Sequence, residues 1–276
     1  MPHAEFLFDP EGHVMNCVAF ASGSGTNFRE AVLASKEQGA WFDINLLVTD
    51  REMKDGKRIG ALGYADKYNV PSITLNGYQH CGSWKAAQND PELLRRYQEK
   101  SEDFNLKIYR EIRNFENESH ESFDFAVLAG YMRLFRGALL RRFANRSINV
   151  HPADLTKMVE GKRKYVGDNA VFDALNAGEE RTRSSVILVD ADTDAGAIIA
   201  SGPWIEYAGP RPVTKESADE HQTRQKELSD WPTLRFALRE ISYSNFALHK
   251  DKFHKDGNPL VVYKGDKMPY GGFELS

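Results

Sequence analysis

The amino-acid sequence predicts an α/β fold built on a largely parallel sheet, and three observations carry this prediction. Short apolar runs alternate with amphipathic stretches, as in sheets whose strands are joined by helices. A glycine-rich turn follows the first apolar run directly. Hydrophobic residues make up 41% and charged residues 28% of the 276 residues, which is ordinary for a globular protein. A chain of this length buries enough surface to fold without disulfides or a structural metal.

Three strands and two helices are expected in the first part of the chain. The apolar run at residues 15–22 predicts a buried strand, and residues 44–49 and 72–75 predict two more. Helices are expected over residues 28–36 and 57–68. In the second of these, Ile59, Leu62 and Ala65 recur at helical spacing.

Residues 76–103 interrupt this alternation. The segment is polar, contains Gly77, Gly82 and Pro91, and includes a charged run over residues 92–102 that could form a surface helix. We interpret it as an insertion or lid within a single domain that spans residues 1–276. A solvated surface decoration is the simpler alternative.

The alternation resumes after residue 103. Further helices are expected over residues 104–115, 138–143 and 171–175, and further strands over 125–129, 147–151, 184–190 and 198–201, the last two as a hairpin. A longer helical segment over residues 215–243 contains Pro232, which must start, kink or split it. Residues 244–276 are expected to form a small C-terminal extension, with strand and turn character over residues 259–272.

Charge and composition exclude several classes of protein. The formal net charge of −4 argues against binding nucleic acid through charge over the whole surface. Cys17 and Cys81 are too few for a disulfide scaffold or a cysteine-rich zinc site. No apolar run approaches the roughly 20 residues of a membrane span, and the first fourteen residues do not have the pattern of a secretory signal. We therefore expect a cytoplasmic protein with small-molecule partners, without nucleic-acid or membrane partners.

The turn Ser22-Gly23-Ser24-Gly25-Thr26-Asn27 lies between a predicted strand and a predicted helix. Glycines permit a tight turn there, and the free amides at the start of the helix attract an anion. A dinucleotide site would need glycine where Phe28 stands, and no Gly-Lys-Ser/Thr follows. The turn therefore suits a single phosphate, and a plain strand-to-helix turn is the alternative.

A second candidate is Ile148-Asn149-Val150-His151-Pro152. Alternation along a strand puts Asn149 and His151 on one face of the sheet. Pro152 cannot continue a central strand, so His151 lies at the carboxyl end, where open α/β sheets bind ligands. A structural histidine beside an asparagine is the alternative.

A third candidate is the acidic turn at residues 190–196, which holds Asp190, Asp192 and Asp194. Its spacing does not match a calcium loop, so a hairpin turn is the simplest interpretation. A carboxylate from this turn next to an imidazole would stabilise the charged ring and fix its orientation.

Taken together and in this order, the segments resemble one family, the glycinamide ribonucleotide transformylases among the folate-dependent formyltransferases. The resemblance covers roughly residues 16–272 with a gap across 76–103. It is carried by the glycine-rich turn, by Asn149 to Pro152, by Asp194-Ala195-Gly196 and by Val127-Leu128-Ala129-Gly130-Tyr131-Met132-Arg133. The resemblance implies a Rossmann-like formyltransferase fold, with a mostly parallel central sheet and helices on both faces.

The resemblance also implies roles for individual residues. Asn149, His151 and Asp194 match the catalytic residues, and Gly25, Thr26 and Asn27 match the loop that holds the substrate phosphate. Glu227 aligns less firmly with a glutamate that binds the acceptor. The folate would be bound by Tyr131, Met132, Arg133, Leu134, Phe135 and Asp190.

By this resemblance the protein transfers a formyl group from N10-formyltetrahydrofolate, its co-substrate, to the amine of glycinamide ribonucleotide in purine biosynthesis. An oxyanion develops on the formyl group during such a transfer, and the donors of Asn149 and of a charged His151 suit it. No metal is required, and no ligand spacing suggests one.

Three departures concern the acceptor side. Ile187, Asn169 and Ala153-Asp154 stand where the family commonly has a histidine, a second histidine and Ser-Leu. Formyl transfer to another amine, such as an amino sugar, therefore stays an alternative. A folate- or phosphate-binding homologue without turnover is the non-enzymatic alternative.

Overall fold

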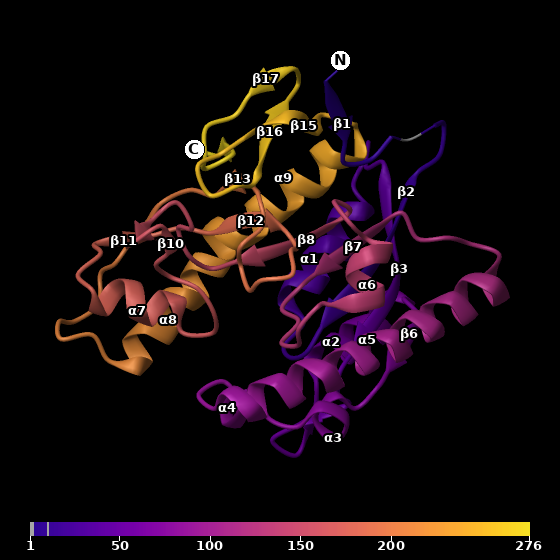
Figure 1. Cartoon of the computed structure of the whole chain (residues 1–276), viewed down its shortest axis with the longest axis horizontal. Helices are drawn as coiled ribbons and strands as arrows, with labels where there is room; N and C mark the ends of the chain where they lie inside the picture. Colours follow the sequence, from indigo (N-terminus) through magenta and orange to yellow (C-terminus); the bar gives the residue numbers. More distant parts are fainter. Residues whose placement is uncertain (1–2, 10) are drawn as a thin grey trace. The chain divides into compact units, whose positions relative to one another are not determined.

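The computed structural model describes residues 3–9 and 11–276, which form two compact units. Unit 1 comprises Met1–His13 and Ile148–Ser276, and unit 2 comprises Val14–Ser147. Figure 1 shows their elements in chain order. No helix in the described part of the chain is long and apolar enough to cross a membrane. The single domain expected over residues 1–276 stays a prediction.

Unit 2 contains a parallel sheet of the expected kind. Its strands are β2 (Met15–Ala21), β3 (Phe42–Thr49), β6 (Ser72–Thr74) and β7 (Phe125–Leu128), in the order β7-β2-β3-β6. The central strand β2 is almost wholly buried, which explains its nearly continuous apolar sequence. The glycine-rich turn follows the carboxyl end of β2.

The helices of unit 2 mostly match the prediction. They include α1 (Thr26–Ser35), α2 (Gly60–Tyr68) and α6 (Gly137–Arg142). The helix expected over residues 57–68 is shorter, because residues 57–58 form β5 (Lys57–Arg58), a hairpin with β4 (Met53–Lys54).

The helix expected over residues 104–115 starts much earlier than predicted, whereas the interpretation of residues 76–103 as an insertion stays a prediction. After two short helices, α3 (Gly77–Cys81) and α4 (Trp84–Ala87), a single helix, α5 (Pro91–Ser119), contains both the charged run and the helix expected over 104–115. Asp90 caps α5 through hydrogen bonds from the amides of Glu92 and Leu93, both 2.9 Å. One buried stripe runs along its length, at Tyr97, Ser101, Phe104, Asn105, Ile108, Ile112 and Glu116.

Unit 1 contains mostly antiparallel strands. Strand β12 (Ser185–Leu188) pairs antiparallel with β8 (Ser147–His151) and with β13 (Ile198–Ser201), which confirms the expected hairpin. Strand β18 (Phe273–Glu274) adds to β13 in parallel. The shorter elements are α7 (Ala170–Asn176) and two hairpins, β9 (Met158–Val159) with β10 (Lys162–Arg163) and β11 (Arg181–Thr182) with β14 (Ile205–Glu206).

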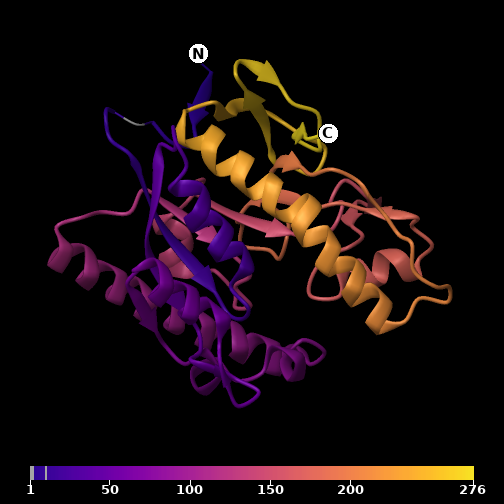
Figure 2. The ribbon, with the colours of Figure 1, turned by 180° about the vertical axis from the view of Figure 1, so that it is seen from behind.

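The long helical segment of unit 1 is divided as Pro232 predicted. Figure 2 shows one rod that consists of α8 (Lys215–Gln225), the π-helical turn η1 (Lys226–Asp230) and α9 (Trp231–Ser242). Pro232 stands in the first turn of α9, directly after η1, where the segment changes from a π-helical to an α-helical turn.

The C-terminal extension forms a small antiparallel sheet. Its strands are β15 (Phe246–Phe253), β16 (Pro259–Tyr263) and β17 (Asp266–Lys267), and β1 (Ala4–Phe6) adds to β15. The sequence analysis did not predict β1 or β15 as strands, because neither consists of an apolar run.

The continuity of α5 is testable with a proline at Glu99, an exposed position in the predicted insertion. Proline in a helix interior removes a hydrogen bond and clashes with the preceding turn, so Glu99→Pro should lower the free energy of unfolding by about 3 kcal/mol. Glu99→Ala, the control, should change it by less than about 0.5 kcal/mol. Urea unfolding followed by circular dichroism measures both, and equal stabilities would show that residues 91–103 are not helical.

Candidate active site

The two polar residues of β8 have the placement that alternation predicts. Asn149 and His151 share one face of the strand, while Ile148 and Val150 occupy the other. Asn149 is half-buried and His151 is buried. Asp194 lies in the turn between β12 and β13, with a φ of 52°.

The side chains of these three residues meet at the carboxylate of Asp194. Its Oδ2 lies 3.3 Å from His151 Nδ1 and accepts a 2.9 Å hydrogen bond from the amide of Gly167. Its Oδ1 accepts a hydrogen bond of 3.4 Å from Asn149 Nδ2. The structure thus brings the three side chains together, and their chemical roles stay predictions.

The second ring nitrogen of His151 also faces an acceptor. Nε2 lies 2.9 Å from the backbone carbonyl of Tyr165, which can only accept a hydrogen bond. A doubly protonated ring satisfies both this carbonyl and the Asp194 carboxylate. Either neutral tautomer would turn a lone pair toward one of them. The geometry therefore favours the charged form of His151 that the predicted chemistry uses.

The side chain of Tyr165 is fixed by a hydrogen bond of its own. Its hydroxyl donates a 2.9 Å hydrogen bond to Glu179, which also pairs with Lys157 at 3.3 Å. Burial disfavours the charged carboxylate of Glu179, but the hydrogen bonds from Tyr165 and Lys157 outweigh it and hold the pKa of Glu179 below its ordinary value. The sequence analysis missed Tyr165, because it acts on His151 through its backbone.

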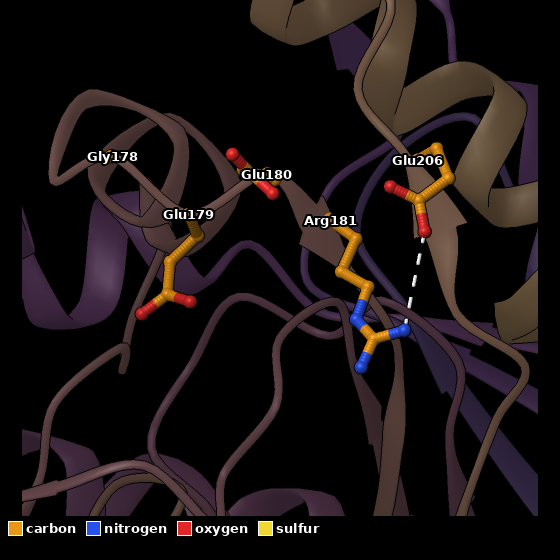
Figure 3. A pocket seen from close by; sticks show the side chains of 5 residues that line it. All are labelled: Gly178, Glu179, Glu180, Arg181 and Glu206. Carbon is orange, nitrogen blue, oxygen red and sulfur yellow. Dashed lines mark ion pairs between the residues drawn. The ribbon is translucent and has the colours of Figure 1, made fainter.

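Glu179 also lines an open pocket, shown in Figure 3. The other lining residues are Gly178, Glu180, Arg181 and Glu206, and Arg181 pairs with Glu206 at 4.0 Å. Three carboxylates around one guanidinium give this pocket a negative charge, which disfavours a phosphate. None of the three candidate catalytic residues lines it.

The glycine-rich turn of unit 2 has the local geometry expected of an anion site. Gly25 has a φ of 71°, and a Cβ there would lie 2.4 Å from the Cα of Ala61, so only glycine fits. The N-cap of α1 is Gly25, so the residue that precedes Thr26 and Asn27 has no side-chain oxygen to offer the first amides of the helix. The start of an α-helix with such a cap attracts an anion, which is the role that the sequence predicts for this turn.

The segment from Tyr131 to Phe135 presents backbone and buried rings. Met132 is exposed, and its amide donates to the Ser22 hydroxyl at 2.9 Å. Phe135 is buried edge-on against Phe20, and the Leu134 carbonyl accepts a 2.9 Å hydrogen bond from Asn105. The buried hydroxyl of Tyr131 has no hydrogen-bond partner among the described residues.

Arg133 was expected to bind folate, but its side chain is occupied within unit 2. It is 6% exposed and lies 2.7 Å from Asp50, and it donates to the Gly82 carbonyl at 3.0 Å and the Tyr97 hydroxyl at 3.3 Å. Arg133 therefore connects the 131–135 segment to the residues between α3 and α5. A folate can meet its backbone, but the guanidinium is already paired.

Of the remaining positions that the sequence analysis named, two are exposed and one serves packing. Glu227 is exposed on η1, and Asp190 is exposed at the start of the acidic turn, where it accepts from the amide of Ala191. Ile187 is buried in an apolar cluster with Leu155 and Ile198.

The other residues that depart from the family pattern are either buried in contacts within unit 1 or exposed. Ala153 packs against Tyr165, and Asp154 pairs with Arg183 at 3.2 Å. Asn169 is exposed at the start of α7.

Buried polar residues behind β12 were not predicted from the sequence. Asp230 of η1 accepts a short hydrogen bond from Ser184, and burial raises the pKa of its carboxyl. A π-helical turn has no sequence signature that the apolar periodicity reveals. Within residues 3–9 and 11–276, no group of three or more His, Cys, Asp or Glu side chains could hold a metal ion.

The Arg133–Asp50 pair makes a pH-dependent prediction. Burial opposes the charge of Asp50, but hydrogen bonds from Arg51, Arg133 and Ser22 outweigh it and lower its pKa. Arg133→Met should therefore cost about 2–4 kcal/mol at pH 7, since Arg51 still compensates part of the buried charge. Because the folded-state pKa of Asp50 is depressed, its contribution is complete above its unfolded pKa of about 3.9 and is lost as pH falls through the folded value.

The difference in stability between wild type and Arg133→Met should accordingly shrink below about pH 4. Urea unfolding at several pH values measures it. Arg58→Met removes an exposed partner of Asp66 and serves as the control, with a loss below about 0.5 kcal/mol. A difference that stays constant down to acid pH would contradict the assignment to Asp50.

Comparisons with known proteins agree with this architecture. A phosphoribosylglycinamide formyltransferase of Bacillus subtilis is 30% identical over 183 residues, which are 66% of this chain and 74% of that protein. A trifunctional purine biosynthetic protein of Drosophila melanogaster is 29% identical over 64% of this chain and 11% of its own length. Four of the curated relatives, the Drosophila protein among them, are matched over 11% to 48% of their own length.

A solved structure supports the fold. The phosphoribosylglycinamide formyltransferase of Coxiella burnetii superimposes with a TM-score of 0.68 over 96% of this chain and 100% of that one, at 22% identity. This likeness confirms the Rossmann-like formyltransferase fold. The sequence model described as formyl transferase matches residues 15–203, well over half of the chain. The chain therefore belongs to the formyl transferase family.

Proposed function

We propose that this protein transfers a formyl group from N10-formyltetrahydrofolate to the amine of glycinamide ribonucleotide, as an enzyme of purine biosynthesis. The observation that carries the proposal is the meeting of Asn149 and His151 at the Asp194 carboxylate. Membership of the formyl transferase family and the names of the curated relatives support it.

The three side chains suit the charges that formyl transfer develops. The acceptor amine attacks the formyl carbon, and an oxyanion forms as the carbonyl double bond opens. Asn149 Nδ2 carries two hydrogens, one of which faces Asp194, so the other is available to the oxyanion. A charged His151 supplies a second donor when it exchanges the Tyr165 carbonyl for substrate.

Asp194 then acts as the proton acceptor. The new bond from the amine nitrogen to carbon leaves a proton on that nitrogen, and the Asp194 carboxylate takes it, directly or through a water. As the bond from carbon to N10 of the folate breaks, the proton taken by Asp194 passes to N10, directly or through the same water, and tetrahydrofolate leaves. The products are the formylated amine and tetrahydrofolate, and no metal enters the scheme.

Two segments of unit 2 are assigned to the substrates. We assign the phosphate of the acceptor to Gly25, Thr26 and Asn27, and Glu227 of unit 1 to the acceptor less firmly. We assign the pterin to the backbone of Tyr131, Met132, Arg133, Leu134 and Phe135, and to Asp190. Both substrates are small molecules, so we expect the protein to act in the cytoplasm without nucleic-acid or membrane partners.

The acceptor is the finer part of the proposal. Ile187, which stands in place of a family histidine, packs with Leu155 and Ile198, so no imidazole is offered at that position. A site without such a donor discriminates less between polar acceptors. An amino sugar is therefore the second acceptor that an assay should include.

The roles of the three residues are tested by substitution. His151→Ala, Asn149→Ala and Asp194→Asn should each lower kcat by about 10²–10⁴-fold, because each removes a donor or the proton acceptor. The assay measures tetrahydrofolate formed from N10-formyltetrahydrofolate and glycinamide ribonucleotide. His120→Asn, at the exposed end of α5, is the control and should leave kcat unchanged. Full activity in the His151 and Asp194 variants would contradict the proposed mechanism.

The phosphate loop is tested by titration. Inorganic phosphate should shift the backbone amide resonances of Thr26 and Asn27, because the start of α1 attracts an anion and its N-cap is a glycine. The amides of Glu92 and Leu93 should not shift, since Asp90 already occupies them. Gly25→Ala should abolish the response through its contact with Ala61. If phosphate does not shift the amide resonances of Thr26 and Asn27 in the wild-type protein, the assignment of the phosphate to this turn is wrong.

A further inference from the structure

The backbone that carries Asp194 is held by side chains from distant parts of unit 1. Arg163 of β10 donates to the carbonyl of Asp194 at 2.5 Å and to that of Gly196 at 2.8 Å. Asn258, between β15 and β16, donates to the carbonyl between them, that of Ala195, at 2.7 Å. Three successive carbonyls of the turn thus each accept a side-chain hydrogen bond.

These donors are connected to one another. Arg163 is 6% exposed and pairs with Asp256 at 3.4 Å, and its Nε donates to the Tyr270 hydroxyl at 3.1 Å. Tyr270 and Asn258 both donate to Asp256, at 2.7 and 2.8 Å. Arg163, Asp256, Asn258 and Tyr270 therefore form one network, which we call the C-terminal clamp.

The carboxylate at the centre of the clamp is charged. Burial disfavours its charge, but the hydrogen bonds from Tyr270 and Asn258 and the nearby Arg163 outweigh it and lower the pKa of Asp256. A charged Asp256 holds the guanidinium in one orientation, with its donors aimed at the turn.

The turn needs such support because its backbone is constrained. Asp194 has a φ of 52°, in the left-handed region that side chains other than glycine seldom adopt. Two residues on, a Cβ at Gly196 would lie 1.9 Å from the carbonyl of Leu188, so the chain passes against β12 there. In this conformation the Asp194 side chain faces Asn149 and His151.

We propose that the C-terminal clamp positions the Asp194 carboxylate against His151 and Asn149. Its members are positioning residues that act through the backbone of the turn and do not touch the reacting atoms. Asp256, Asn258 and Tyr270 lie outside the residues 15–203 that match the family model, so the clamp gives the C-terminal extension a role in the site. That the positioning serves catalysis rests on the proposed formyl transfer.

The first test is spectroscopic and needs no activity. Protein labelled with ¹⁵N-histidine reports the ring nitrogens of His151, one of which faces Asp194. Arg163→Lys cannot donate to both carbonyls in the same way, and Asn258→Ala donates to none. Both variants should shift the His151 Nδ1 resonance in the direction that Asp194→Asn shifts it. Unchanged His151 resonances in both folded variants would overturn the proposal.

The second test is a double-mutant cycle on kcat. A small displacement of a catalytic group can cost about 10²-fold in rate, so each clamp variant should lower kcat by about 10- to 100-fold in the wild-type background. In the Asp194→Asn background the same substitutions should lower kcat less than about twofold, since the carboxylate they position is gone. Equal losses in the two backgrounds would show a structural role only and would overturn the proposal.

A matched control separates positioning from stability. Arg142 of unit 2 likewise holds a carboxylate, Glu116 at 3.2 Å, and a backbone carbonyl, that of Phe123 at 2.6 Å. Arg142→Lys should lower the melting temperature without shifting His151. Should Asp194→Asn keep full kcat while the clamp variants still shift His151, the proposed mechanism fails and the positioning inference stands.

Discussion

The candidate site of unit 1 depends on the surroundings of one carboxylate. Asp194 accepts a hydrogen bond from Asn149 and from the Gly167 amide, and it faces His151 Nδ1 at 3.3 Å. The ring is fixed at its other nitrogen by the Tyr165 carbonyl. Because Asn149 and His151 both contact this carboxylate, a displacement of Asp194 would change the orientation of both side chains.

Both units use a buried arginine to fix a loop near predicted functional residues. Arg163 binds Asp256 and two carbonyls of the Asp194 turn, and Arg133 binds Asp50 and the carbonyl of Gly82. A guanidinium can do this because its planar set of donors reaches a carboxylate and several carbonyls at once. Lysine offers a single charged atom and cannot replace either arginine without losing contacts.

Much of the site could be predicted from local sequence. Alternation in β8 and the following Pro152 placed Asn149 and His151 on one face at a strand end, and the structure has them there. The identity of the partner carboxylate came from the family resemblance, since three aspartates of the turn were equivalent by pattern alone. Arg163 and Tyr165 had no signal in the sequence. Arg163 donates to backbone carbonyls and Tyr165 contacts His151 through its own backbone carbonyl, and only the fold brings these groups together.

The helix predicted over residues 104–115 is too short, and the reason is that the buried stripe of α5 is partly polar. The charged residues of α5 other than Glu116 occupy its solvent face, whereas its buried face includes the polar Ser101 and Asn105. Ser101 donates to the Tyr97 carbonyl, and Asn105 to the Ser101 and Leu134 carbonyls, so their burial is compensated. Counting apolar residues at helical spacing misses a stripe that contains polar residues. The predicted helix therefore began only at residue 104, although α5 begins at Pro91.

The most direct test of the central claim is the protonation of the His151 ring beside Asp194. Long-range ¹H–¹⁵N spectra of protein labelled with ¹⁵N-histidine distinguish a protonated from an unprotonated ring nitrogen. With an acceptor at each nitrogen, the account predicts hydrogens on both Nδ1 and Nε2 of His151 under assay conditions. A ring with an unprotonated Nδ1 facing an intact Asp194 would contradict it.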